Sequence, residues 1–347
     1  KKGKAAGLPT SEPEGFFGNY YCAAIGGNDD GTREQSSGIE FNSGIVFAGT
    51  TVAENCSAIG GGGNGFGEVT INGGIVTAVA ATTGTAIGGG IGYSSHGGEG
   101  RVNINGGTVY AYNLDNKRGI PSSAIGGAGS SESVGTWGTV NITGGYVYAY
   151  SALGTAIGGG SSRNKTGGNA VVTITGGEVI AISNSGAGIG GGTACTGGKA
   201  SGLNGGTASI IISGNPIIRT GSIGGGETKS PGGKIGSADI SISGGDIQAQ
   251  FVMAAGAKST PSFTMTGGTI RDSDATDNSE YIHLEKNGGA VYLEDGTFNM
   301  SGGTIRDCAG EYGGAVYIKK GAESTEAPSF NMSGGEIYLC KAKRDGG

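Results

Sequence analysis

Carboxylates and a histidine are concentrated between residues 271 and 287, and these are the residue types that carry out acid–base chemistry. Glycoside hydrolysis uses a pair of carboxyl groups, and polysaccharide elimination uses a positioned base. The candidates in this segment are Asp274, Asp277, Glu280 and His283. However, Arg271-Asp272 recurs one repeat later as Arg306-Asp307, which indicates a structural ladder of ion pairs. We therefore expect no catalytic residue, with a polysaccharide lyase or glycoside hydrolase as the alternative.

Oxygen ligands that calcium prefers occur in one short turn, where Asp29 and Asp30 follow Asn28. The repeat pattern of calcium-binding β-rolls does not occur in the chain. The two histidines, His96 and His283, are too few and too isolated in the sequence to predict a zinc site. We therefore expect no cofactor, with calcium at Asp29 and Asp30 as the alternative.

Aromatic residues supply the strongest candidate for ligand binding. Tyr110, Tyr112, Tyr148 and Tyr150 alternate with Val and Ala in two equivalent segments, so one face of each strand is aromatic. Tyr93 and Trp137 lie in neighbouring loops and complete the predicted ligand-binding set. Stacked phenol rings fit the apolar C–H face of a sugar, and their hydroxyls meet its polar groups. Two alternatives stay open: the strip is covered by loops or a flanking domain, or it mediates self-association.

A repeat positions these residues. Ala-Ile-Gly-Gly or a close variant recurs at steps of 28 to 38 residues, with its isoleucines at Ile25, Ile59, Ile87, Ile125, Ile157, Ile189 and Ile223. A loop follows each copy, and then a unit with alternating apolar residues on both sides of a Gly-Gly corner, as in Val69–Val76 and Val140–Val147. Ten such units run to Phe330–Ile337. The loops are expected to leave one corner and stack along one side, most of them as solvated Gly/Ser turns.

Three short strands in about 30 residues predict one coil of a parallel β-helix. A propeller blade needs four antiparallel strands and more residues, which makes it the weaker interpretation. We therefore predict an all-β, right-handed parallel β-helix of about ten coils with three short strands in each. Inward Ile, Val, Phe and Met form the core, and glycine makes the corners.

The domain prediction follows from the repeat. Residues 1–21 precede the first repeat and form an N-terminal extension or cap, and residues 22–347 form one β-helix. Within it, residues 22–250 carry Ala-Ile-Gly-Gly coils and residues 251–347 carry Gly-Gly-Ala-Val-Tyr coils. Arg344-Asp345-Gly346-Gly347 resembles the start of another repeat, so the β-helix is expected to continue beyond residue 347 in a longer protein.

Four of the five cysteines form two pairs in repeat register, Cys22 with Cys56 and Cys308 with Cys340. Partners in adjacent coils lie about 4.8 Å apart, which is within the range of a disulfide, although parallel stacking does not aim the sulfur atoms at each other. Each pair is therefore either a disulfide or a ladder of thiols. Cys195 has no partner in register.

Composition excludes several classes of protein. The formal net charge of −6 gives no basic surface for nucleic acid. No apolar run is long enough for membrane insertion. Glycine makes up 80 of 347 residues without the strict period of collagen.

The repeats also carry a resemblance to a family. The Ala-Ile-Gly-Gly rungs and the unit from Gly296 to Ile305 resemble the glycine-rich repeats of large surface proteins of Gram-positive gut and rumen bacteria. The resemblance implies a parallel β-helix adhesin or glycan-binding module that is secreted or attached to the cell wall. It implies a glycan or a host or cell-surface ligand as partner, and no catalytic residue. A structural stalk or fibre subunit that assembles end to end or laterally is the third functional hypothesis.

Overall fold

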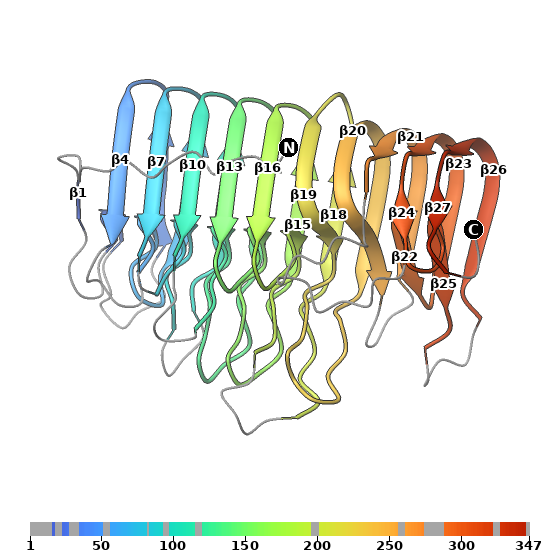
Figure 1. The fold of residues 1–347 in the computed structure, drawn as a ribbon. Coiled ribbons are helices and arrows are strands. Elements are labelled where there is room, and N and C mark those ends of the chain that lie inside the picture. The colour runs from blue at the N-terminus through green and yellow to red at the C-terminus, as the bar shows by residue number, and fades with distance from the viewer. Residues whose placement is uncertain are drawn as a thin grey trace.

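The protein is a right-handed parallel β-helix. The computed structural model describes residues 16–17, 23–27, 35–50, 56–81, 83–92, 97–114, 120–195, 201–255, 261–273, 288–321 and 327–344. All regular structure in these ranges is β-strand, and the strands pair in parallel. In Figure 1 the front strands run downward while the chain advances from left to right, which gives the right-handed sense. The fold prediction is confirmed.

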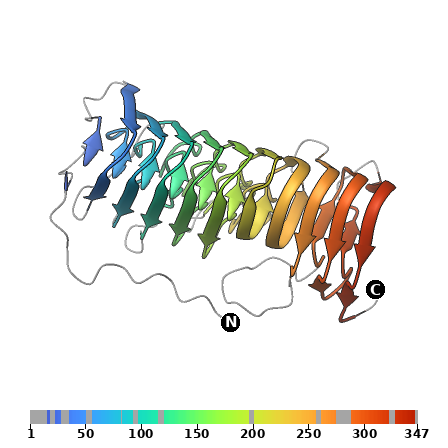
Figure 2. The same cartoon turned by 90° about the horizontal axis from the view of Figure 1, so that it is seen from above.

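Three ladders of strands run along the rod (Figures 1 and 2). The first, the rung ladder, contains β2 (Ile25–Gly26), β5 (Ile59–Gly60), β8 (Ile87–Gly88), β11 (Ile125–Gly126), β14 (Ile157–Gly158) and β17 (Ile189–Gly190). The second contains β3 (Gln35–Phe41), β6 (Phe66–Ile71), β9 (Gly100–Ile104), β12 (Gly138–Ile142), β15 (Ala170–Ile174) and β18 (Ala208–Ile212). The third contains β1 (Phe16–Phe17), β4 (Ile45–Thr50), β7 (Ile75–Ala80), β10 (Thr108–Asn113), β13 (Tyr146–Ser151), β16 (Glu178–Ser183) and β19 (Ile217–Gly224).

The C-terminal coils continue the same ladders with longer strands. They contain β20 (Ala238–Ala255), β21 (Ser262–Arg271), β22 (Val291–Glu294), β23 (Thr297–Arg306), β25 (Val316–Lys319) and β26 (Ser329–Tyr338). The short strands β24 (Ala309–Gly310) and β27 (Lys341–Ala342) pair with each other in a separate sheet. In β20, β21, β23 and β26 the corner becomes a bulge within one strand. Val252 pairs with Ile223 on one side and Val291 on the other, so one rung ladder passes through both types of repeat.

Inward side chains fill the rod as the strand alternation predicts. In one coil, Val140 and Ile142 of β12, Val147 of β13 and Ile157 of β14 are all fully buried. Farther along, the rings of Phe263 and Phe298 stack at 4.3 Å between centroids with an interplanar angle of 10°. Identical residues in adjacent coils therefore lie in face-to-face contact, because in-register pairing places them one strand spacing apart.

The glycine of each rung is required by the next coil. Gly126 has φ +127°, and a Cβ built on it would lie 2.2 Å from the carbonyl oxygen of Gly158. A Cβ built on Gly88 would lie 2.0 Å from the carbonyl oxygen of Gly126, and one built on Gly158 would lie 2.0 Å from that of Gly190. Any side chain would meet backbone atoms there, so glycine sets the distance between coils.

The loops that follow the rungs stack in register with one another. Isolated parallel bridges join Gly92, Ser130, Ser162, Ala194 and Thr228 in sequence. The Ser162 hydroxyl donates a hydrogen bond to the carbonyl of Ser133, 2.6 Å away in the previous loop. Stacking along one side is confirmed (Figure 1). The expectation of solvated turns is wrong for these loops, because backbone bonds between coils extend into them.

The rung glycine makes a direct prediction. We expect Gly126→Ala to destabilise the protein by more than about 2 kcal/mol, because it combines an unfavourable φ with a backbone clash. Gly202→Ala is the matched control, since Gly202 also has positive φ (+72°) but open space around its Cβ position. Chemical denaturation measures both free energies of unfolding, and equal losses would contradict the clash.

Candidate functional site

Five tyrosines form one cluster on the outer side of β10 and β13. This aromatic patch consists of Tyr110, Tyr112, Tyr146, Tyr148 and Tyr150, whose strands pair in register. Ring centroids lie 5.9 Å apart for Tyr110 and Tyr146, 6.4 Å for Tyr110 and Tyr148, and 5.6 Å for Tyr112 and Tyr148. All three pairs are tilted, as aromatic pairs prefer. The structure therefore brings the four predicted strand tyrosines together.

The patch is less exposed than the sequence alone indicates. Tyr112 and Tyr148 keep only 8% and 7% of their accessible surface. Tyr110, Tyr146 and Tyr150 are half-buried. Neighbouring rings cover one another because the paired strands β10 and β13 hold them one strand spacing apart. Contact with a ligand is therefore available mainly at Tyr110, Tyr146 and Tyr150.

Burial keeps the hydroxyls of Tyr112, Tyr146 and Tyr148 neutral over the physiological pH range. Burial raises the pKa of Tyr112 to about 12, and the neighbouring phenols Tyr148, Tyr110 and Tyr146 add to the effect. Burial also raises the pKa of Tyr146 and of Tyr148. The Tyr150 hydroxyl accepts a hydrogen bond of 2.7 Å from Asn184 Nδ2, which fixes its orientation. A phenol hydroxyl can both donate and accept a hydrogen bond.

Sequence reasoning missed Tyr146. It follows the corner directly, and it lies on the outer face in the column that contains Thr108 and Glu178. The parity of Tyr146 relative to Tyr148 was the signal that could have identified it, since residues two apart share a face.

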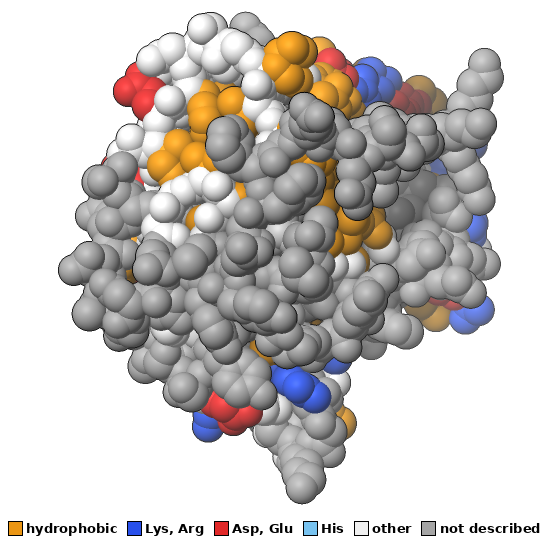
Figure 3. Space-filling view, turned by 90° about the vertical axis from the view of Figure 1, so that its left-hand side faces the viewer, with side chains coloured by type: hydrophobic (Ala, Val, Ile, Leu, Met, Phe, Trp, Pro, Cys, Tyr) orange, Lys and Arg blue, Asp and Glu red, His pale blue; other side chains and the backbone are white. Residues whose placement is uncertain are grey.

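Exposed aliphatic residues flank the patch along the third ladder. Ile45 is 82% and Ile75 is 42% exposed in the first coils, and Ile182 (37%) and Ile217 (40%) follow the patch. Figure 3 views the molecule from the end nearest Ile45's strand, β4, and shows hydrophobic side chains at the surface. The outer face of this ladder is thus apolar over several coils.

The two predicted loop aromatics do not join the patch. Trp137 is 49% exposed, but it lies just before β12, in the second ladder, across the corner from β13. Tyr93 lies outside the described residues. The predicted set is therefore correct for the strand tyrosines, whereas Trp137 occupies another face of the rod.

The recurring Arg-Asp motif forms ion pairs, as its register predicts. Arg271 pairs in register with Arg306, and each guanidinium donates from Nη1 to the following aspartate, Asp272 or Asp307. Arg271 also donates from Nε and Nη2 to the two oxygens of Asp246, at 2.6 and 2.7 Å. These hydrogen bonds hold the pKa of Asp246 below its usual value, so it is ionised. This is a structural ladder of neutralised charges.

The remaining acid and metal candidates lie outside the described residues. They are Asp274, Asp277, Glu280 and His283, and the calcium candidates Asp29 and Asp30. Within the part of the chain that the structure describes, no group of three or more His, Cys, Asp or Glu side chains is arranged to hold a metal ion.

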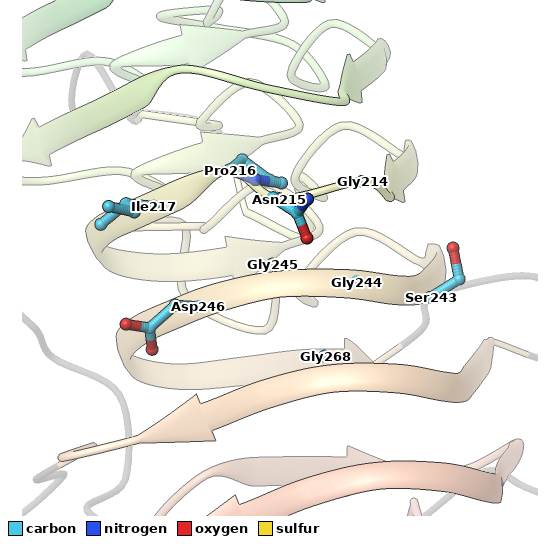
Figure 4. Close-up of a pocket in the computed structure, with 9 residues that line it drawn as sticks. All are labelled: Gly214, Asn215, Pro216, Ile217, Ser243, Gly244, Gly245, Asp246 and Gly268. Carbon is cyan, nitrogen blue, oxygen red and sulfur yellow. The ribbon is translucent and has the colours of Figure 1, made fainter.

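A groove opens at the corner between the second and third ladders. It has a volume of about 440 Å³, and Gly214, Asn215, Pro216 and Asp246 are among its lining residues (Figure 4). One extra residue causes it. Ile212 pairs with Ile174, and Ile217 pairs with Glu178. Four residues therefore lie between the paired positions at this corner, whereas three lie between them in the preceding coil.

A carboxyl group is buried within the loop stack. Glu227 is 7% exposed, and burial raises its pKa from 4.5 to about 8, while the positive charge of Lys229 acts in the opposite direction. Burial also raises the pKa of Cys195, with Lys229 lowering it and Glu227 raising it. Sequence reasoning missed Glu227 because it assigned the loops to solvent.

Cys308 and Cys340 lie in adjacent coils, as their register predicts. The Lys341 amide donates to the Cys308 carbonyl at 2.8 Å, and the next residues pair in β24 and β27. The structure holds both side chains as thiols. The sulfur of Cys308 donates to the Arg306 carbonyl and that of Cys340 to the Tyr338 carbonyl. Cys22 lies outside the described residues, and Cys56 is buried.

Comparisons with protein-family models, with curated proteins and with solved structures found no match for this chain. Among the described residues, no helix is long and apolar enough to cross a membrane. The function must therefore be argued from the geometry of the aromatic patch, the corner groove and the ion pairs.

Glu227 predicts a pH dependence of stability. Its pKa is higher in the folded than in the unfolded state, so its contribution to stability is complete below about pH 4.5 and is lost as the pH rises through about 8. We expect Glu227→Gln to lose less free energy of unfolding over this interval than the wild type. Urea denaturation at both ends of the interval measures this. Lys229→Met removes the charge that lowers the pKa of Glu227, so it should steepen the pH dependence of the free energy of unfolding. Parallel curves for all three proteins would refute the role of Glu227.

The cysteine pair predicts an oxidative cross-link. With oxidised glutathione as oxidant, we expect a Cys308–Cys340 disulfide that stabilises the protein by about 3 to 4 kcal/mol, as loop closure suggests. Formation should be slow, because burial raises the pKa of Cys308 to about 12 and little thiolate is present. Peptide mass analysis detects the bond, with Cys340→Ser as control. Alkylation of both thiols after prolonged oxidation would exclude it.

Proposed function

We propose that the protein is a non-catalytic binding module of the extracellular surface and that it recognises carbohydrate through the aromatic patch. The observation that carries the proposal is the cluster of five tyrosines on two paired strands, four of which form ring pairs with centroids 5.6 to 6.4 Å apart. Secretion or wall attachment rests on the family resemblance of the repeats.

The chemistry of the patch fits a sugar chain. Phenol rings offer an apolar surface to the C–H face of a pyranose, and neutral hydroxyls hydrogen-bond to its hydroxyls. Tyr110 and Tyr146, which are half-buried, place such a surface at the outside of the sheet. Tyrosine also has few rotatable bonds, so little side-chain entropy is lost on binding.

Electrostatics around the patch favour a neutral glycan. Glu178 lies next to Tyr146 in the following coil, and Arg219 lies one coil farther along. Arg219 donates a hydrogen bond to Glu178, and the two charges neutralise each other. The charges along this ladder are balanced within the protein. They therefore give no excess of positive potential that would attract an acidic polysaccharide.

Mutation of the exposed tyrosines tests the proposal. We expect Tyr110→Ala and Tyr146→Ala each to weaken binding to immobilised neutral polysaccharides about tenfold, since a lost ring contact removes on the order of 1 kcal/mol or more. Affinity electrophoresis against β-glucan, xylan, mannan and galactan measures the retardation.

Trp137→Ala is the matched control, because it removes an exposed aromatic side chain from another face of the rod. Loss of binding in Trp137→Ala with unchanged binding in both tyrosine variants would refute the patch as the site. Absence of retardation of the wild type by every polysaccharide would refute carbohydrate binding by the module.

A further inference from the structure

We propose that the corner groove at Asn215 binds one sugar unit of the same neutral glycan that crosses the aromatic patch, so that it acts as a second subsite. This inference rests on the proposed function. It adds the path that the bound glycan follows along the rod. The groove has a volume of about 440 Å³, which lies within the range of small-molecule sites.

The groove results from a local change in the corner. The extra residue and Pro216 push the chain outward, and the following coils return to three residues between Ile242 and Asp246. Gly244 and Gly245 line the groove beside Asn215, and the ring of Pro216 lies against Gly245. In Figure 4 the Asn215 side chain points toward these glycines, and Ile217 and Asp246 lie on the same side.

The groups at the rim match the two faces of a sugar. Ile217, which is 40% exposed, offers an apolar surface for C–H groups, whereas Pro216 is buried. Asn215 offers an amide with both donors and an acceptor, which suits a hydroxyl group. The apolar side and the polar side of the groove are thus distinct, as a pyranose ring requires.

The ion pair at the rim is oriented for hydroxyl recognition. Asp246 is held by two hydrogen bonds from Arg271, which in turn donates to Asp272. Arg271 is not among the lining residues, and its two bonds hold the Asp246 carboxylate in place. The two oxygens of Asp246 retain lone pairs. The Asn215 amide and the fixed Asp246 carboxylate therefore supply a donor and acceptors for neighbouring hydroxyls.

Charge balance indicates a neutral sugar. Among the residues that line the groove, only Asp246 carries a charge, and its carboxyl group is ionised. A carboxylated or sulfated sugar would meet this negative charge at close range, whereas a neutral sugar would not.

The groove is continuous with the aromatic patch. Tyr146, Glu178, Ile217 and Asp246 occupy the same column in four successive coils. At the spacing of about 4.8 Å between strands, Asp246 lies roughly 14 Å along the rod from Tyr146. An extended oligosaccharide that lies parallel to the rod axis would contact both sites, and a disaccharide would not.

Chain length and groove filling test the inference together. The probes are disaccharides and hexasaccharides of the gluco, xylo, manno and galacto series, with affinities measured by titration calorimetry. Asn215→Trp fills the groove, and Ser43→Trp is the control because Ser43 is exposed at the equivalent corner of the first coil. Thermal unfolding verifies that both variants are folded. We expect Asn215→Trp to weaken hexasaccharide binding about tenfold, to leave disaccharide binding unchanged, and Ser43→Trp to match the wild type.

The outcomes separate the two proposals. If Asn215→Trp binds the hexasaccharide as the wild type does while Tyr110→Ala loses affinity, the groove proposal is overturned and the patch stands. If Asn215→Trp abolishes binding and Tyr110→Ala does not, the groove stands and the patch is overturned. If neither variant changes affinity, or if the wild type binds none of the probes, both proposals are overturned.

Discussion

The contact between stacked rung glycines is the constraint on which the rest of the structure depends. The carbonyl oxygen of Gly158 occupies the place where a side chain on Gly126 would be, and this repeats from coil to coil. In the glycine coils the approach leaves no room for a side chain between adjacent rungs, whereas Tyr292 and Tyr317 take this position in the C-terminal coils, where the parallel pairing continues. Because the spacing is uniform, equivalent residues form straight columns along the rod. An isolated substitution in such a rung would therefore disturb the following coil as well as its own.

Columns explain how a repetitive scaffold can carry a specific surface. Inward positions are restricted to Ile, Val, Ala, Phe and Met because they must fill the same space in each coil. Outward positions do not carry this restriction. One column of the third ladder contains Thr77, Tyr110, Tyr148, Ile180 and Arg219 in successive coils. The surface can therefore change from aromatic to charged within two coils while the backbone stays the same.

The sequence predicts the features that depend on the repeat period and on the alternation of side chains along a strand. The rung isoleucines, the inward Val140 and Ile142, the Arg271–Arg306 ladder and the facing of Tyr110 and Tyr148 all follow from spacing alone. The burial of Tyr148 does not, because it depends on how neighbouring rings tilt. The pKa of Glu227 does not, because it depends on a loop that packs where a solvated turn was expected. The corner groove could have been found by counting residues between Ile212 and Ile217, since a single insertion breaks an otherwise constant corner.

Rigid columns also decide how such a surface binds a ligand. Each sugar contact with one tyrosine or one ion pair contributes little, and association must overcome the loss of translational and rotational freedom. Sites held at a fixed separation on one rod act together, because the first contact raises the effective concentration of the ligand at the second. The backbone bonds from coil to coil and the Asp246–Arg271 ion pair keep both sites in place before the ligand arrives, so little ordering is lost on binding. Under the proposed function, affinity would depend on the length and linkage geometry of the glycan, which must match the spacing of the coils.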